Sequence, residues 1–216
     1  MKEEKILQEV ATYVERKLSG EGSGHDWWHI VRVRKLAEKL ALAEGGDSFI
    51  CQLAALVHDL VDDKLVADEG LALAEVRDLL TRVGVAANQT DQVLTIIQSI
   101  SYKGGNQNHL DLTLEGQIVQ DADRLDAMGA IGVARTMAYS GHHQRIIHDP
   151  EVAVRQNMTL DQYRSHQGTA ITHFYEKLLL LKDLMNTKTA QELAKGRHAF
   201  LEAYLDQFFA EWDGQR

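Results

Sequence analysis

The sequence has little proline and few aromatic residues, and it lacks the alternating Val, Ile and Thr runs that predict strands. Pro150 is the only proline among 216 residues, whereas average usage of about 5% would give roughly eleven. Aromatic residues make up 6% of the chain. Few turns demand proline, and long stretches run without a break. We therefore predict an all-α fold, a helical bundle formed by a single domain.

Cysteine, long apolar runs and excess positive charge are also scarce. Cys51 is the only cysteine, which excludes an intramolecular disulfide and indicates a reducing compartment. Residues 1–5 are charged where a signal peptide would need an apolar run, and no apolar run approaches the ~20 residues of a membrane span. We expect a cytoplasmic protein with no membrane partner.

The net charge of −9 comes from 23 Lys and Arg against 32 Asp and Glu. An acidic surface repels a phosphate backbone, so a nucleic-acid partner is not expected. A small anionic substrate can still bind where a local cation or metal ion reverses the field.

Apolar residues recur at helical spacing along most of the chain. They predict helices over about 4–18, 26–44, 47–61, 70–83, 90–102, 114–128, 129–139, 159–185 and 188–212. The last helix begins with Thr189 to Glu192, which fits a capping box. Residues 103–109 predict a loop, and 140–158 form a connection long enough to serve as a lid. One domain covering 1–216 is the simplest account.

His58 and Asp59 follow the apolar run 53–57, so a polar pair ends a segment that is predicted to be buried. Burying a carboxylate without a partner is costly, and a metal ion is a common compensation. Imidazole and carboxylate ligands suit Zn, Fe, Mn or Ni, and Mg is the hard alternative. Two adjacent ligands cannot complete a site, and His29 and Asp123 are the best candidates for the others.

The spacing His29, His58-Asp59 and Asp123 resembles the signature of the HD-domain metal-dependent phosphohydrolase superfamily. The local sequences HIVRV (29–33), LAALVHD (53–59) and DADRL (121–125) are similar to those of the family. The segments GHDWWH (24–29) and DADRLDAMG (121–129) most resemble a branch of stand-alone bacterial proteins that are read as nucleotide pyrophosphohydrolases. The resemblance implies a metal-binding core over about 25–130, completed by the helices over 159–212. It also implies one divalent metal ion, with Mn or Mg favoured for activity.

Asp62 and Asp63 extend the motif to HDLVDDK (58–64). On a continuous α-helix, residues four apart share a face, so Asp62 would lie next to His58 and Asp63 next to Asp59. The segment resembles the His-Asp-x-x-Glu-Asp segment of alarmone hydrolases in the superfamily. That resemblance implies that Asp62 is the general base and Asp63 a supporting group, although Asp here replaces the longer Glu.

A phosphorylated substrate also needs cations and hydrogen-bond donors. Our candidates lie near the metal motifs or in the glycine-rich loop, and they are His25, Arg32, Lys64, Lys103 and Arg124. Trp27 and Trp28 are expected to pack in the core.

The motifs favour an enzyme that hydrolyses a phosphoanhydride bond of a soluble (deoxy)nucleoside triphosphate. Diesterase branches of the superfamily carry extra histidines, often for a second metal. The segment 96–103 has none, so one metal ion is expected. Two alternatives stay open: a non-catalytic sensor of metal and nucleotide, and an HD-type iron oxygenase or lyase. A homodimer is compatible with these readings.

Overall fold

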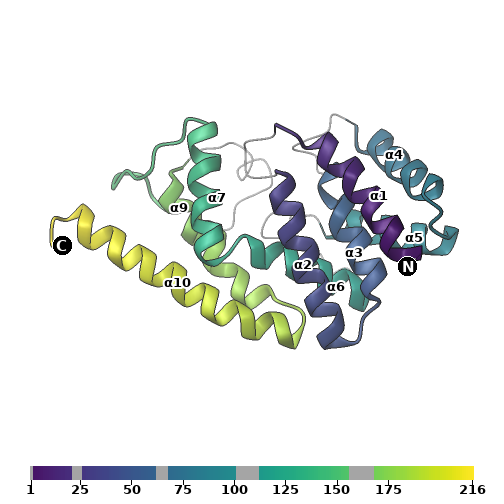
Figure 1. Ribbon diagram of the computed structural model, residues 1–216. Helices are drawn as coiled ribbons and strands as arrows, with labels where there is room; N and C mark the ends of the chain where they lie inside the picture. Colours follow the sequence, from purple (N-terminus) through teal and green to yellow (C-terminus); the bar gives the residue numbers. More distant parts are fainter. Residues whose placement is uncertain (1, 21–25, 62–67, 101–111, 156–167) are drawn as a thin grey trace. The chain divides into compact units, whose positions relative to one another are not determined.

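The fold is mainly helical in the part of the chain that the structure describes. The computed structural model describes residues 2–20, 26–61, 68–100, 112–155 and 168–216, and none of them forms a strand. The α-helices (Figure 1) are α1 Lys2–Lys17, α2 Trp27–Glu44, α3 Ser48–Val57, α4 Glu69–Arg82, α5 Ala87–Ser99, α6 Leu114–Asp126, α7 Gly129–His142, α9 Ala170–Glu176 and α10 Lys188–Trp212. Two 3₁₀ helices, η1 His58–Val61 and η2 Leu178–Leu184, complete the order. The predicted all-α class is confirmed.

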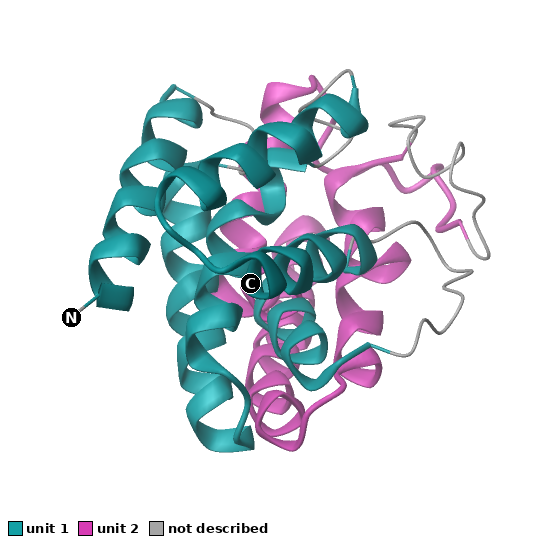
Figure 2. Cartoon of the chain, turned by 90° about the vertical axis from the view of Figure 1, so that its right-hand side faces the viewer, with its two compact units in different colours: residues 1–103, 107–123 teal, residues 104–106, 124–216 magenta. Residues whose placement is uncertain are grey.

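The chain forms two compact units, which Figure 2 shows in different colours. Unit 1 comprises residues 1–103 and 107–123, and unit 2 comprises 104–106 and 124–216. Helix α6 belongs to unit 1 up to Asp123 and to unit 2 from Arg124. The organisation as a single domain stays a prediction.

The centre of unit 1 is α3, which packs against α1, α2 and α5. Every residue from Phe49 to Val57 is buried, because this stretch is apolar except for Gln52 and other helices surround it. Burial raises the pKa of the Cys51 thiol to about 12, so this residue remains neutral and packs as a small apolar side chain. His58 and Asp59 follow this helix directly, so the chain places them at the end of a buried helix.

Two adjacent glycines connect α2 to α3. Gly45 ends α2 in the left-handed conformation, with φ of 80°, and its N–H donates to the carbonyl of Ala41. Gly46 approaches α6 so closely that a Cβ atom there would lie 2.6 Å from the side chain of Ile118. A bulky residue at Gly46 would push against the helix that carries Asp123.

Unit 2 is built from α7, α9, η2 and α10. The buried side chains of α10 are Ala190, Ala194, Leu201 and Leu205, which form one stripe along the helix. Phe174 of α9 stacks on Tyr204 of α10, with ring centroids 5.5 Å apart. Helix α10 appears in yellow in Figure 1.

The predicted helix over 159–185 is wrong as one continuous element. Residues 156–167 lie outside the described part of the chain, α9 begins only at Ala170, and η2 follows a break at Lys177. Thr169 and Thr172 form a reciprocal capping box, which starts a new helix in the middle of the predicted one. The cap of α10 also differs from the prediction, because Thr187, and not Thr189, accepts the N–H of Ala190.

The predicted connection over 140–158 is partly helical, since α7 continues to His142. Arg145 donates from its guanidinium to the carbonyl of Thr169, 3.1 Å away. This contact links the connection to the start of α9. Among the described helices, none combines the length and the hydropathy needed to cross a bilayer.

Candidate metal centre

His29 lies in the first turn of α2 and is fully buried. Asp26 is the N-cap of this helix, and its carboxylate accepts the backbone N–H of His29 at 2.8 Å. Capping therefore fixes the backbone of His29 directly, on a helix whose inner face is packed against α3.

His58 and Asp59 begin the 3₁₀ helix η1 directly after α3. The nitrogen Nδ1 of His58 lies 2.9 Å from the carbonyl oxygen of Ala55. A carbonyl only accepts, so Nδ1 donates to it, and in the neutral ring this leaves the lone pair on Nε2 for a metal ion. This is the orientation that a ligating imidazole needs.

The expectation that an α-helix continues through this motif is wrong for residues 58–61. In a continuing α-helix, the Ala55 carbonyl would accept the Asp59 N–H, whereas here it accepts from the His58 ring. A 3₁₀ helix has about three residues per turn, so residues four apart do not share a face on η1. The expected pairing of Asp62 with His58 and of Asp63 with Asp59 therefore does not follow from helix geometry. Asp62 and Asp63 themselves lie outside the described residues.

The two histidines and Asp59 form a tight buried group. Nε2 of His29 lies 3.5 Å from Oδ2 of Asp59, and Nε2 of His58 lies 3.2 Å from Oδ1. One candidate ligand atom from each of the three residues lies within 4.8 Å of the others. Asp59 thus presents one carboxylate oxygen to each histidine.

Asp123, on α6, completes the group from a different element. Its Oδ1 lies 3.4 Å from Nε2 of His29 and 3.9 Å from Nε2 of His58. The Asp123 side chain is 41% exposed, whereas the other three residues are buried. The group is therefore accessible to solvent on the side of Asp123.

These distances fit one divalent ion. Two atoms that each lie about 2.1 Å from an ion are about 3.0 Å apart at a right angle and about 4.2 Å apart on opposite sides. The observed separations of 3.2 to 3.9 Å fall between these limits. Two imidazoles and two carboxylates suit Mn, Fe, Zn or Ni. His29, His58, Asp59 and Asp123 could together hold such an ion.

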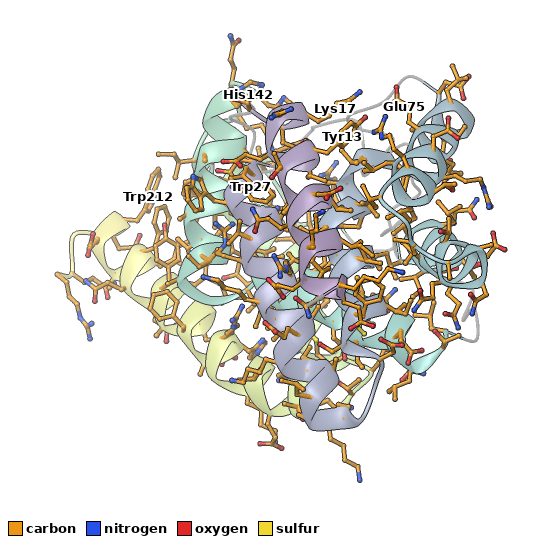
Figure 3. All side chains as sticks on the ribbon, turned by 45° about the vertical axis from the view of Figure 1, so that its right-hand side comes forward. Tyr13, Lys17, Trp27, Glu75, His142 and Trp212 are labelled. Atoms are coloured by element: carbon orange, nitrogen blue, oxygen red, sulfur yellow. The ribbon has the colours of Figure 1, made fainter. Side chains whose placement is uncertain are left out.

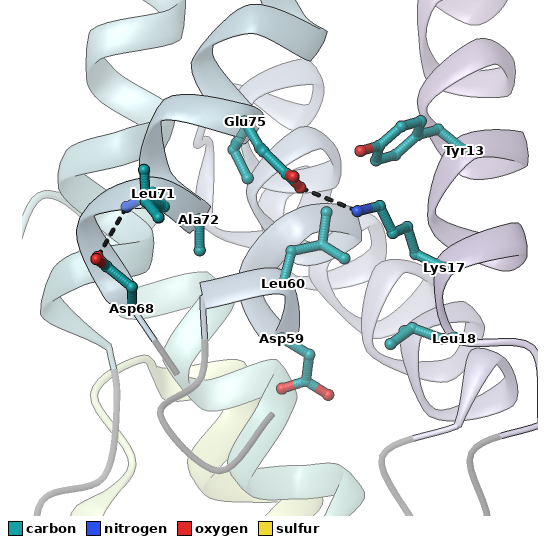
Figure 4. Close-up of a pocket in the computed structure, with 10 residues that line it drawn as sticks. Tyr13, Lys17, Leu18, Asp59, Leu60, Asp68, Leu71, Ala72 and Glu75 are labelled. Atoms are coloured by element: carbon teal, nitrogen blue, oxygen red, sulfur yellow. Dashed lines mark hydrogen bonds and ion pairs between the residues drawn. The ribbon is translucent and has the colours of Figure 1, made fainter. Parts of the chain in front are cut away.

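A cavity of about 420 Å³ adjoins Asp59 in unit 1. It is lined by α1, η1 and α4, with Asp59 and Leu60 on its η1 side (Figure 4). Lys17 of α1 and Glu75 of α4 form an ion pair at 3.0 Å along the wall, next to Tyr13 (Figures 3 and 4). Its hydrogen bond to Glu75 raises the pKa of Lys17, so the ammonium remains charged at neutral pH.

The structure describes two of the predicted substrate-binding residues. Arg32 is half-buried on α2, one turn after His29. Arg124 is buried, and its guanidinium donates to the carbonyl of Leu184 in unit 2, so it has a structural contact. Their roles in substrate binding stay predictions. His25, Lys64 and Lys103 lie outside the described residues.

The expectation of core packing is wrong for Trp28, which is 64% exposed, and Trp27 is half-buried. Trp28 is in the first turn of α2, next to His29, whose side chain takes the inward direction. The analysis of the sequence also missed the cavity residues Tyr13, Lys17 and Glu75. They belong to ordinary amphipathic helices, and no motif marks them.

Known proteins are similar to this chain in sequence and in structure. The family model described as HD domain matches residues 27–128, a range that contains all four candidate ligands. The uncharacterized protein YpgQ of Bacillus subtilis is 41% identical over 208 residues, which cover 96% of this chain and 94% of YpgQ.

Solved structures are also similar over nearly the whole chain. A protein from Lactobacillus plantarum is 44% identical with a TM-score of 0.87, over 98% of both chains. The crystal structure of YpgQ in complex with ADP has a TM-score of 0.79 at 38% identity, covering 98% of this chain and 97% of YpgQ. An HD-superfamily hydrolase from Bacillus thuringiensis has a TM-score of 0.77 at 41% identity, over 99% of both chains. The helical fold agrees with these matches, and the chain belongs to the HD-domain family.

Proposed function

We propose that this protein is a metal-dependent phosphohydrolase that hydrolyses a phosphoanhydride bond of a soluble (deoxy)nucleoside triphosphate. The observation that carries the proposal is the buried group of His29, His58 and Asp59, with Asp123 within 3.4 Å of His29. Such a set of side chains, accessible from one side, suits an ion that keeps positions open for water and substrate.

A divalent ion held there would supply a Lewis acid for a phosphoryl oxygen and lower the pKa of a bound water. The chain's own residues have separate tasks. The Ala55 carbonyl fixes the proton of His58 on Nδ1, and the Asp26 cap fixes the backbone of His29. Buried Asp59 brings negative charge between the two imidazoles. Asp62, with Asp63 in support, is proposed to take the proton from the attacking water, an assignment that rests on the resemblance to alarmone hydrolases.

Two relatives support the choice of substrate class. YpgQ, 38% identical to this chain over nearly its full length, was crystallised in complex with ADP. The similar protein from Bacillus thuringiensis is described as an HD-superfamily hydrolase. A nucleoside di- or triphosphate contains a phosphoanhydride bond that water can hydrolyse at a metal centre. Its negatively charged phosphates are attracted to a metal cation.

The test is a panel of ribo- and deoxyribonucleoside triphosphates, assayed with Mn²⁺ or Mg²⁺ and with products resolved as phosphate or pyrophosphate. We expect pyrophosphate or phosphate release by the wild-type protein and by Asp78→Ala, which removes an exposed carboxylate on α4. Asp59→Ala should release neither. Nucleotide binding without hydrolysis under every metal would favour the sensor, and turnover that requires iron and dioxygen would favour the oxygenase.

A further inference from the structure

The cavity beside Asp59 has a charge pattern that decides which part of a substrate it can hold. Its carboxylates are Asp59, Asp68 and Glu75, and Lys17 is its cation among the described lining residues. Glu75 already pairs with Lys17, while Asp68 accepts the N–H of Leu71 as the N-cap of α4. An acidic cavity of this kind disfavours a triphosphate chain and favours an uncharged group that donates hydrogen bonds.

The remaining lining is apolar and suits a flat ring. It consists of Leu18, Leu60, Leu71, Ala72 and Val76, together with the ring of Tyr13. Leu71 is 68% exposed, so it stands at the rim, whereas Val76 is buried. The volume of about 420 Å³ lies within the range of about 300–1,000 Å³ that is usual for small-molecule sites. A nucleobase with its sugar needs such a space, with apolar walls for the base and carboxylates for hydroxyl and amino donors.

Asp59 belongs to both the cavity wall and the metal group, and this shared residue sets the direction of the substrate. Its carboxylate lies 3.2 Å from Nε2 of His58 and 3.5 Å from Nε2 of His29. We propose that the cavity between α1, η1 and α4 receives the nucleoside end of the nucleotide, so that the phosphates extend past Asp59 to the metal centre. The assignment rests on the proposed function, since it takes a nucleotide as the substrate.

If the cavity binds only the nucleoside, changes in the cavity should affect only substrates that contain one. The test therefore compares two substrates. One is the nucleotide that is hydrolysed fastest in the panel, and the other is inorganic tripolyphosphate, which has the phosphates and no nucleoside. Ala72→Phe places a ring inside the cavity, and Leu71→Trp narrows its rim without disturbing a buried position. Leu42→Trp is the matched control, because Leu42 is 75% exposed on α2 and does not line the cavity.

We expect both cavity variants to lower kcat/KM for the nucleotide, relative to kcat/KM for tripolyphosphate, by about tenfold or more, the usual scale of a filled binding site. This decrease in kcat/KM should come from a higher KM for the nucleotide. Leu42→Trp should keep the wild-type ratio. Thermal unfolding of each variant shows whether Ala72→Phe has damaged the fold, and in that case Leu71→Trp decides. If tripolyphosphate is not hydrolysed, its inhibition constant against the nucleotide replaces its kcat/KM.

An unchanged ratio in Leu71→Trp would overturn the assignment, whether both substrates are affected equally or neither is. Failure of the proposed function has a different signature, since the wild-type protein would then hydrolyse neither compound. Calorimetric titration with ADP in the presence of Mn²⁺ would still test the cavity. We expect Leu71→Trp to weaken ADP binding by about tenfold relative to Leu42→Trp, and equal affinities would reject the cavity as the nucleoside site.

Discussion

At the scale of single residues, Asp59 is the centre of the candidate metal site. It offers one oxygen to His58 and the other to His29, at 3.2 and 3.5 Å, and it is almost completely buried. A buried carboxylate is stabilised by hydrogen bonds, by a charged partner or by a bound metal ion. A divalent ion between these groups would supply that stabilisation.

Replacing Asp59 with Ala should therefore abolish stoichiometric metal binding. The remaining histidines and Asp123 would lose the buried carboxylate that lies against both imidazoles. Metal content after dialysis against Mn²⁺ can be measured by elemental analysis, with Asp78→Ala as the control that removes a carboxylate from the exposed face of α4. Equal metal content in the two variants would contradict the ligand assignment.

Asp62 should affect turnover and not metal binding. We propose Asp62 as the general base, and it is outside the set of four ligands. The variant Asp62→Ala should therefore lower kcat by about 10²–10⁴-fold, while its metal content stays near that of the wild type. Steady-state kinetics and elemental analysis on the same preparation separate the two effects. Unchanged turnover would move the role of base to Asp63 or to the metal alone, and loss of the metal would make Asp62 a ligand.

At the scale of helices, the sequence predicts most elements because their buried apolar residues recur at helical spacing. The predicted helix over 188–212 matches α10, and that over 26–44 matches α2 to within a residue. The prediction fails where side chains bond to the backbone. The capping box of Thr169 and Thr172 begins α9 inside a predicted helix. Where α3 ends and η1 begins, the His58 ring donates a hydrogen bond to the carbonyl of Ala55. The spacing of apolar residues carries no information about such hydrogen bonds between side chains and the backbone.

The metal centre and the cavity differ in how far they could be predicted. The four candidate ligands lie in compact motifs that resemble those of a known family, and in the structure the Nε2 atoms of the two histidines lie 3.2 to 3.9 Å from carboxylate oxygens of Asp59 and Asp123. Lys17 and Glu75 are 58 residues apart, and each sequence position alone resembles an exposed charge on a helix. Only the packing of α1, η1 and α4 reveals that they share a wall.

The N-caps of α2 and α3 allow the link between helix and metal centre to be tested. Asp26 accepts the N–H of His29, whereas Asp47 accepts the N–H groups of Phe49 and Ile50 at the far end of α3. Asp26→Ala and Asp47→Ala should each lower the free energy of unfolding by about 1 kcal/mol. Only Asp26→Ala frees the backbone of a candidate ligand, so it should also weaken Mn²⁺ binding by about tenfold.

Chemical denaturation measures the first effect and calorimetric titration with Mn²⁺ the second. Asp47→Ala serves as the matched control, since it removes the same kind of cap from the same unit without touching a candidate ligand. Equal Mn²⁺ affinities in the two variants would show that the cap of α2 does not position His29.

At the scale of the whole molecule, the candidate ligands join elements that are far apart in the chain. His29 comes from α2, His58 and Asp59 from η1, and Asp123 from α6, and all four belong to unit 1. An ion bound to them would connect three segments that the unfolded chain leaves independent. Because such a site does not exist in the unfolded state, binding free energy adds to the stability of the fold.

Metal should therefore raise the melting temperature. At a free Mn²⁺ concentration about 100 times the dissociation constant, binding to the folded state alone contributes about 2.7 kcal/mol. For a chain of this length, each kcal/mol corresponds to about 2–4 °C, so Tm should increase by about 5–10 °C over the protein in EDTA. Thermal unfolding followed by circular dichroism measures the shift. Asp59→Ala should melt at the same temperature with and without Mn²⁺, and a shift of equal size in that variant would place the stabilising ion somewhere other than this centre.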